Sequence, residues 1–133
     1  MANVTDVQVV ANTGRRYVVR LLGELDTTNE AAVTKVDIST LTDAAGTAAT
    51  YSAIDRIEYD VAGFASVELE WDATANDKIV TLTPGQGIMD WSKEGGLVDP
   101  KSTGTTGDIK LTTTGTAGAT TNYNITIWLR PKA

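Results

Sequence analysis

The sequence predicts an all-β protein: one antiparallel β-sandwich or jelly roll of about eight strands. Three observations favour this class. Apolar and polar residues alternate with a period of two in most segments, the chain contains 22 threonines, and glycine-containing turns recur between the alternating segments. Threonine is β-branched and therefore suits strands. No segment keeps the apolar spacing of a helix over several turns.

The chain length of 133 residues is that of one common domain, and two domains would each be too small to stand alone. We therefore expect a single β-sandwich domain over residues 1–133. Hydrophobic residues make up 41% of the chain, a globular composition rather than a disordered one.

Alternation places strands along the whole chain. In chain order they are Val4 to Val10, Arg15 to Leu25, Val33 to Ser39, Ile57 to Val61, Val67 to Trp71, Lys78 to Thr83, Asp108 to Thr113, and Asn122 to Arg130. In the third of these strands Val33 stands apart from the alternation of Val36 and Ile38, so the pattern leaves its ends open. In the last strand Tyr123, Ile125, Ile127 and Leu129 are expected to face inward.

The clearest hairpin is predicted in the middle of the chain. Apolar and charged residues alternate in two successive segments, with Ala62-Gly63 as the turn between them. The apolar set is Ile57, Tyr59, Val61, Val67, Leu69 and Trp71, and the charged set is Arg56, Glu58, Asp60, Glu68, Glu70 and Asp72. A half-buried antiparallel sheet requires this alternation. We expect Trp71 in the core and the two acidic rows opposite each other on the solvent side.

Residues 84–107 are predicted to be the longest irregular segment, because they contain six glycines and two prolines. A loop of roughly 20 residues in a compact domain is usually functional or disordered. This segment also contains apolar residues, which indicate that it is ordered against something. They are Ile88, Met89, Trp91, Leu97 and Val98.

The composition excludes most catalytic chemistry within this chain. There is no cysteine, which removes disulfides, thiol nucleophiles and Cys-type zinc sites. There is no histidine, which removes the usual general base near neutral pH and the commonest transition-metal ligand. We therefore expect a protein that is not an enzyme and holds no cofactor.

The formal net charge is −6, so the basic footprint of a nucleic-acid-binding protein is missing and direct nucleic-acid contact is not expected. No apolar run approaches the length needed to span a bilayer. The start Met1-Ala-Asn has neither a charged nor an apolar leader region, so we expect synthesis in a cytoplasm without a secretory signal.

Three patterns suggest binding or catalysis, and each has a plainer alternative. The acidic row Glu68, Glu70 and Asp72 could form a glycosidase pair, but a solvated outer face is favoured. The turn Asp72, Asn76 and Asp77 could supply oxygens to Ca²⁺, although its spacing is not that of an EF-hand and these residues also favour plain turns; whether calcium binds stays open. Gly85-Gln-Gly87 begins like a phosphate loop but lacks the rest of such a motif.

The aromatic residues suggest an interface. Trp128 alternates with the inward Ile127 and Leu129, so it should point away from the main core, and Trp91 lies in the long glycine-rich segment. Exposed tryptophans often anchor interfaces, although both could instead cover the domain's own surface. The predicted interface residues are Met89, Trp91, Leu97 and Trp128.

The whole chain resembles the small virion proteins encoded beside the capsid genes of tailed bacteriophages. The resemblance is carried by the Met1-Ala-Asn start, the Thr/Gly/Ala-rich strands, the segment Asp90 to Pro100 and the ending Tyr123 to Arg130. It is one of style and composition over the full length of the chain. It implies a capsid decoration (cement) protein, often a trimeric β-rich cap on the outer shell, or a head-completion or tail protein.

From these observations we expect a structural virion protein that is assembled in the host cytoplasm and stabilises a capsid by added subunit contacts. Its expected partners are copies of itself, with a trimer favoured, and the major capsid protein. The alternatives are a head-tail connector, tail or fibre component, and a carbohydrate-binding module in which Trp91 and Trp128 stack on sugars. A hydrolase is the least favoured alternative.

Overall fold

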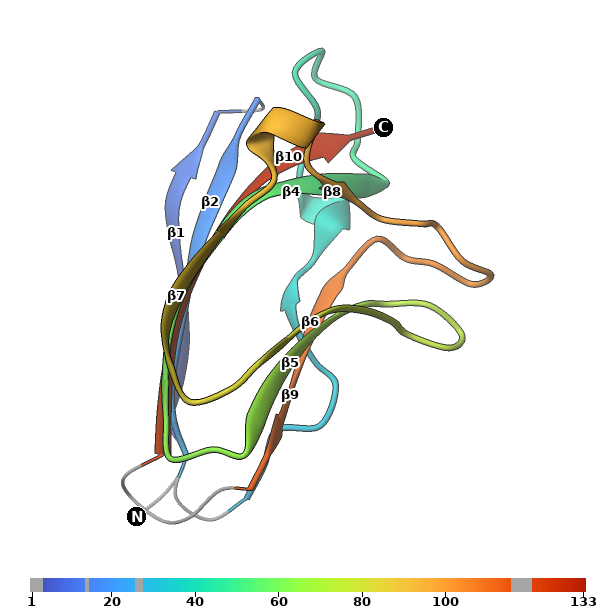
Figure 1. The fold of residues 1–133 in the computed structure, drawn as a ribbon. Helices are drawn as coiled ribbons and strands as arrows, with labels where there is room; N and C mark the ends of the chain where they lie inside the picture. The colour runs from blue at the N-terminus through green and yellow to red at the C-terminus, as the bar shows by residue number, and fades with distance from the viewer. Residues whose placement is uncertain (1–3, 14, 26–27, 116–120) are drawn as a thin grey trace.

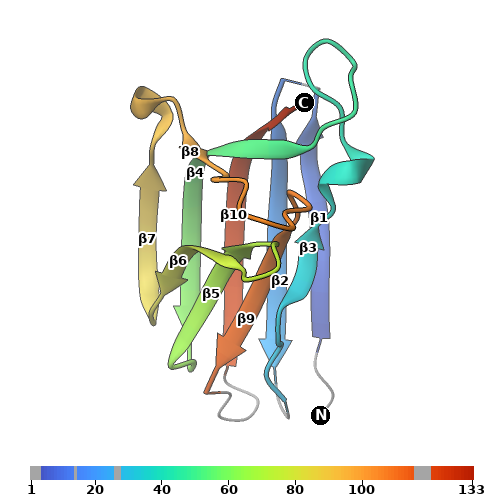
Figure 2. The same ribbon diagram turned by 90° about the vertical axis from the view of Figure 1, so that its right-hand side faces the viewer.

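A computed structural model confirms the all-β prediction: two antiparallel sheets lie face to face as a β-sandwich (Figure 1). The structure describes residues 4–13, 15–25, 28–115 and 121–133. The larger sheet has the order β1-β2-β10-β4-β7, with β8 added beside β4, and the smaller sheet has the order β3-β9-β5-β6. Figure 2 shows the smaller sheet in front of the larger one.

Ten strands and two short 3-10 helices form within these residues, two strands more than the number predicted. The strands of the larger sheet are β1 (Val4–Asn12), β2 (Tyr17–Leu25), β4 (Tyr51–Ala62), β7 (Gly85–Asp90), β8 (Leu97–Val98) and β10 (Thr121–Lys132). Those of the smaller sheet are β3 (Val33–Val36), β5 (Ser66–Trp71), β6 (Asp77–Leu82) and β9 (Ile109–Thr114). The helices are η1 (Ile38–Thr40) and η2 (Ser92–Glu94).

Strand β10 is the centre of the larger sheet, because it pairs along most of its length with β2 on one side and β4 on the other. Its predicted inward set is confirmed: Tyr123, Ile125, Ile127 and Leu129 are all buried. They meet apolar side chains of the smaller sheet, among them the fully enclosed Leu69, Leu111 and Trp71. A two-residue period over a long strand thus supplies one wall of the core.

The prediction of a central hairpin is wrong. Strand β4 pairs with β10, β7 and β8 in the larger sheet, whereas β5 pairs with β6 and β9 in the smaller one. Residues 62–65 therefore cross between the sheets instead of turning back within one. Alternation shows only that one face of each strand is buried. It does not name the partner strand, and these two segments bury their apolar faces in the same core from opposite sides.

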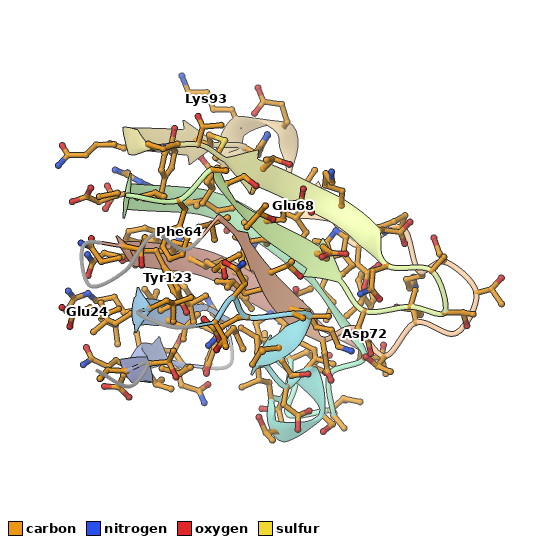
Figure 3. All side chains as sticks on the ribbon, turned by 90° about the horizontal axis from the view of Figure 1, so that it is seen from below. Glu24, Phe64, Glu68, Asp72, Lys93 and Tyr123 are labelled. Atoms are coloured by element: carbon orange, nitrogen blue, oxygen red, sulfur yellow. The ribbon has the colours of Figure 1, made fainter. Side chains whose placement is uncertain are left out.

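The crossover between the sheets is shaped by two residues. Gly63 has a φ of 82°, in the left-handed region that glycine adopts without strain. Phe64 then turns inward and is only 3% exposed, with its ring 6.2 Å from the ring of Tyr123. Figure 3 shows these two aromatic side chains near each other at the lower end of the sandwich. Phe64 thus closes the core where the chain changes sheets.

The prediction of one irregular segment over residues 84–107 is also wrong, because β7, η2 and β8 lie within it. Strand β7 pairs with β4, and its Gly87 lies opposite Tyr59. A Cβ at Gly87 would lie 2.6 Å from the Tyr59 hydroxyl oxygen, so glycine here allows a tyrosine to cover its neighbour strand. Gly85 and Gly87 belong to a strand, which replaces the phosphate-loop interpretation.

The predicted strand over Val33 to Ser39 is shorter in the structure, since β3 ends at Val36 and η1 follows. The ladder with β9 shifts between Thr34 and Val36, which leaves Lys35 as an extra residue. Lys35 turns into the protein instead of toward solvent. Its ammonium nitrogen lies 2.7 Å from a Glu30 carboxylate oxygen, and the two side chains are only 4% and 9% exposed.

A cluster of polar side chains joins the two sheets. It consists of Glu30, Lys35 and Tyr123 and is called the Glu30 cluster below. The Tyr123 hydroxyl on β10 donates to the second Glu30 oxygen at 2.5 Å. The backbone of Glu30 is bound to β9, because the Thr113 N–H donates to the Glu30 carbonyl and the Thr113 hydroxyl accepts from the Glu30 N–H. Removing one member of a buried ion pair leaves an uncompensated charge, so the three groups should act as a unit.

Burial, the hydrogen bond to Glu30 and the negative charge of Glu30 all raise the pKa of Tyr123. The folded protein then keeps this proton at a pH where the unfolded chain has lost it, above the ordinary tyrosine pKa of 10.0. The folded state binds more protons, so stability falls as pH rises through this range.

We predict that Tyr123→Phe flattens this loss of stability. In urea unfolding between pH 8 and pH 11, the wild-type free energy of unfolding should fall more steeply above pH 10 than that of the variant, by up to about 1.4 kcal/mol per pH unit. Tyr17, whose pKa is also raised by burial, is present in both proteins and cancels. Parallel curves for the two proteins would contradict the assignment.

Candidate functional site

Three of the four predicted interface residues lie together at the upper end of the sandwich. Met89 pairs with the buried Ile57, and Leu97 pairs with the buried Ile54. Side chains of directly paired residues point to the same face, so both face inward. Met89, Leu97 and Trp91 are each partly buried and pack against the hydrophobic core. They cover the end of the core between β7 and β8.

Trp128 lies on the other side of the larger sheet. It pairs with Val18 on β2 and with Arg56 on β4, and all three side chains point outward, away from the smaller sheet. The Arg56 guanidinium carbon lies 5.3 Å from the centre of a Trp128 ring, a cation–π distance. Val18 is only 5% exposed although it faces outward. The outward direction predicted for Trp128 is therefore correct, and Trp128 does not share a surface with Met89 and Leu97.

The segment after β7 is fixed to the larger sheet by a charged contact. Asp55 and Arg130 form an ion pair, with the Arg130 Nε at 3.0 and 3.2 Å from the two carboxylate oxygens. The same guanidinium donates to the Gly95 carbonyl at 2.5 Å, and the Trp91 N–H donates to the Asp55 carbonyl at 2.8 Å. Asp55 is the extra residue of a bulge in the β4–β10 ladder. The bulge turns its carboxylate toward Arg130.

The two predicted acidic rows do not face each other. Glu68 and Glu70 lie on the outer face of the smaller sheet, whereas Glu58 and Asp60 lie on the outer face of the larger one, because β4 and β5 belong to different sheets. The core separates the two rows, so they cannot flank one substrate as a glycosidase pair must. Figure 3 shows Glu68 and Asp72 away from Glu24, which belongs to the larger sheet.

The acidic residues of the smaller sheet are largely paired with neighbours. Glu68 lies 3.3 Å from the Lys78 ammonium, and Asp72 lies 3.0 Å from that of Lys110. The Thr112 hydroxyl donates to Glu70 at 3.1 Å. This sheet face is therefore a network of ordinary exposed or half-exposed ion pairs, each worth about 0–1 kcal/mol.

Two of the three proposed calcium ligands, Asp72 and Asn76, already have other partners. The Asp72 carboxylate accepts from Thr106 and Lys110, and these contacts hold its pKa below the usual range. The Asn76 side-chain oxygen accepts from the Ala73 N–H at 3.1 Å, which closes the turn. One oxygen of Asp77 is buried without a hydrogen-bond partner. Within the described ranges, no group of three or more Asp, Glu, His or Cys residues could hold a metal ion.

The concavities on the described part of the surface are shallow and open to solvent. One of about 400 Å³ lies across β1, β2 and β10 near the lower end of the larger sheet. Its lining includes Asp6, Leu22, Glu24, Asn122 and Asn124, whose side chains share the outer face according to the ladder register. Neither Trp91 nor Trp128 lines it. The arrangement that a sugar-binding platform needs, a flat aromatic beside amides and acids, is thus not assembled at this concavity.

The most unusual surface is one that sequence reasoning missed. Every residue of β1 is exposed or half-exposed. Val4, Val7, Val9 and Val10 are between 40% and 60% exposed. A signal was present in the sequence: these valines do not keep a strict two-residue period, as a strand seated on a core would.

The register of the β1–β2 ladder shows where the smaller sheet stops covering the inner face of the larger sheet. Val7 and Val9 pair with Leu21 and Val19 on β2, so all four side chains point to the inner face of the larger sheet. Leu21 and Val19 are fully buried, whereas Val7 and Val9 are not. The smaller sheet therefore stops covering the larger one between β2 and β1.

Comparisons of this chain with protein-family models, with curated proteins and with solved structures find no match. Among the described residues, no helix is long and apolar enough to cross a membrane.

We predict that Asp55→Ala loosens residues 91–96 selectively. Without the carboxylate, the Arg130 guanidinium is no longer held where it can donate to the Gly95 carbonyl. The free energy needed to open this segment should fall by about 2 kcal/mol. Amide hydrogen exchange of this segment should accelerate, while β2 and β9 stay protected. The control is Asp60→Ala on the same strand, whose carboxylate accepts a hydrogen bond from the exposed Gln86 at 3.3 Å. Equal exchange in the two variants would contradict the role of Asp55.

Proposed function

We propose that this chain is a structural subunit of a bacteriophage particle that decorates and stabilises the capsid through subunit contacts. The virion assignment rests on the resemblance of the whole chain to small phage virion proteins. That resemblance is carried by the Met1-Ala-Asn start, the Thr/Gly/Ala-rich strands, residues 90–100 and residues 123–130. The partners proposed are further copies of this chain and the major capsid protein. The place of action is the virion, with assembly in the host cytoplasm.

The observation that supports a role in assembly is the uncovered strand β1. A well-packed domain seldom leaves four valines of one strand open to water, and exposed apolar patches commonly mark interaction sites. A contact that forms only between folded subunits also stabilises the assembly by mass action. Decoration of a shell uses this principle, since each added contact favours the assembled state.

The chemistry of the exposed residues also supports a binding role over catalysis. The chain has no histidine and no cysteine, and its two acidic rows lie on opposite outer faces. Its net charge of −6 favours protein partners over nucleic acid.

A head-tail connector, tail or fibre component is the second candidate, because the same resemblance covers such proteins. The two roles differ in symmetry: decoration predicts threefold or lattice-matched contacts, whereas a tail tube predicts sixfold rings. A carbohydrate-binding module is a third candidate that rests only on the half-buried Trp91 and Trp128.

The test is cryo-electron microscopy of purified particles of the phage that encodes this chain, combined with mass spectrometry of their proteins. We expect density for this β-sandwich on the outer shell, in a fixed stoichiometry to the major capsid protein. Density in the tail would select the second candidate. Absence of the chain from purified particles would contradict both virion roles.

A further inference from the structure

Strand β1 is the outer edge of the larger sheet, since β2 is its one partner among the described strands. Its side chains are uncovered on both faces. Val7 and Val9 point toward the inner face, Val4 points outward beside Glu24, and Val10 is the extra residue of a bulge. Val33, near the edge of the smaller sheet, adds a further apolar side chain that is 39% exposed.

We propose that a second copy of this chain covers the β1 flank, with the two β1 strands antiparallel about a twofold axis at Gln8. This goes beyond the proposed function, because it names a partner surface and a symmetry whether or not the assembly belongs to a virion.

The free backbone groups of β1 have the alternation that this pairing requires. The Val7 N–H donates to the Asp6 carboxylate at 2.9 Å, so it points to the open edge and away from β2. In an antiparallel ladder the direction of the N–H and C=O groups alternates along the strand. The groups of Thr5 and Val9 therefore also point to the open edge, while those of Asp6 and Gln8 point to β2.

Gln8 has a valine on each side, so a twofold contact centred on it brings like apolar residues together. With the axis at Gln8, Val7 lies opposite Val9 of the second copy, and Val9 lies opposite its Val7. Both pairs use the backbone groups that face the open edge, so each can exchange two hydrogen bonds. Four inward-facing valines then form one apolar cluster, and the two Gln8 side chains meet on the outer face.

The charges on β1 permit this register. Asp6 is the one charged residue of the strand, and in this arrangement it lies opposite Val10 of the second copy and not opposite another Asp6. The Val7 N–H exchanges the Asp6 carboxylate for a backbone carbonyl of the partner. Asp6 still accepts from the Gln8 side chain at 3.1 Å, so it keeps a partner. The bulge at Val10 lies outside the Val7 to Val9 segment that forms the central pairs.

The area of the flank fits a modest dimer. Nine residues at about 3.3 Å each make β1 roughly 30 Å long. Stacked sheets lie about 10 Å apart, and the thickness of the strands themselves brings the width of the flank to roughly 15 Å. Two copies then bury on the order of 1,000 Å², the lower end of specific interfaces. We expect a dimer that forms at micromolar or higher concentration. The resemblance to phage proteins favours a trimer instead, so the measured mass decides between the two.

The test uses the absence of cysteine from the chain, because one introduced cysteine is then the only thiol. At the axis, two Gln8 residues face each other as a non-hydrogen-bonded pair with Cα atoms about 4.5 Å apart, within disulfide reach. Gln8→Cys should form a disulfide-linked dimer under oxidised glutathione at least tenfold faster than Gln86→Cys. Gln86 is the matched control, being an exposed glutamine on β7, the opposite edge strand.

A second substitution separates association from chance collision. Val9→Lys in the Gln8→Cys background should slow cross-linking at least tenfold, whereas Val98→Lys on β8 should leave it unchanged; melting temperatures check that both fold. Equal rates for Gln8→Cys and Gln86→Cys, no effect of Val9→Lys, or a native mass of three chains would overturn the twofold contact. If the chain is found on virions but Gln8→Cys does not cross-link, the twofold contact is wrong and the proposed function stands. If Gln8→Cys cross-links but the chain is absent from virions, the contact stands and the proposed function is wrong.

Discussion

The mismatch in width between the two sheets is the constraint on which the rest of this structure depends. The larger sheet carries β1, β2, β10, β4 and β7 side by side, but the smaller sheet has four strands to cover them. The central strand β10 is buried on its inner face along its whole length, whereas every residue of β1 is exposed or half-exposed. A domain built in this way has one closed core and one uncovered edge. The core explains why the protein folds, and the uncovered edge is the surface on which we propose a contact with another molecule.

Polar and apolar contacts close the two ends of the sandwich. At the lower end, the Glu30 cluster ties the segment before β3 to β10, and Phe64 fills the crossover between β4 and β5. At the upper end, Asp55 and Arg130 hold the turn around η2, and Met89 and Leu97 cover the core beneath it. Buried ion pairs contribute little net stability but penalise any arrangement that separates them. The Tyr123–Glu30 contact therefore favours one relative position of the sheets, whereas Asp55 and Arg130 act within the larger sheet and its η2 turn.

Sequence patterns predicted the burial of individual strands well and the pairing of strands poorly. The inward set of β10, the burial of Trp71 and the outward Trp128 follow from a two-residue period. The same period in Ile57–Val61 and Val67–Trp71 could not show that the strands lie in different sheets, because burial of one face is common to both arrangements. The sequence did not predict β7, because Gly85 and Gly87 lower its strand propensity. Glycine is needed at position 87, where the Tyr59 side chain lies over the backbone. Lys35 could not be predicted as buried without its partner Glu30, which lies on a separate segment.

We propose that this protein functions through a surface and not through a cleft, and that β1 meets a second copy of the chain. Amide hydrogen exchange as a function of protein concentration tests this claim most directly. In the single chain the Val7 N–H has only the exposed Asp6 carboxylate, and the Val9 N–H faces the open edge. Protection of these two amides should rise with concentration, while amides on the opposite edge strand β7 stay unchanged. Exchange at Val7 and Val9 that is independent of concentration, or protection that rises at β7 instead, would contradict the account.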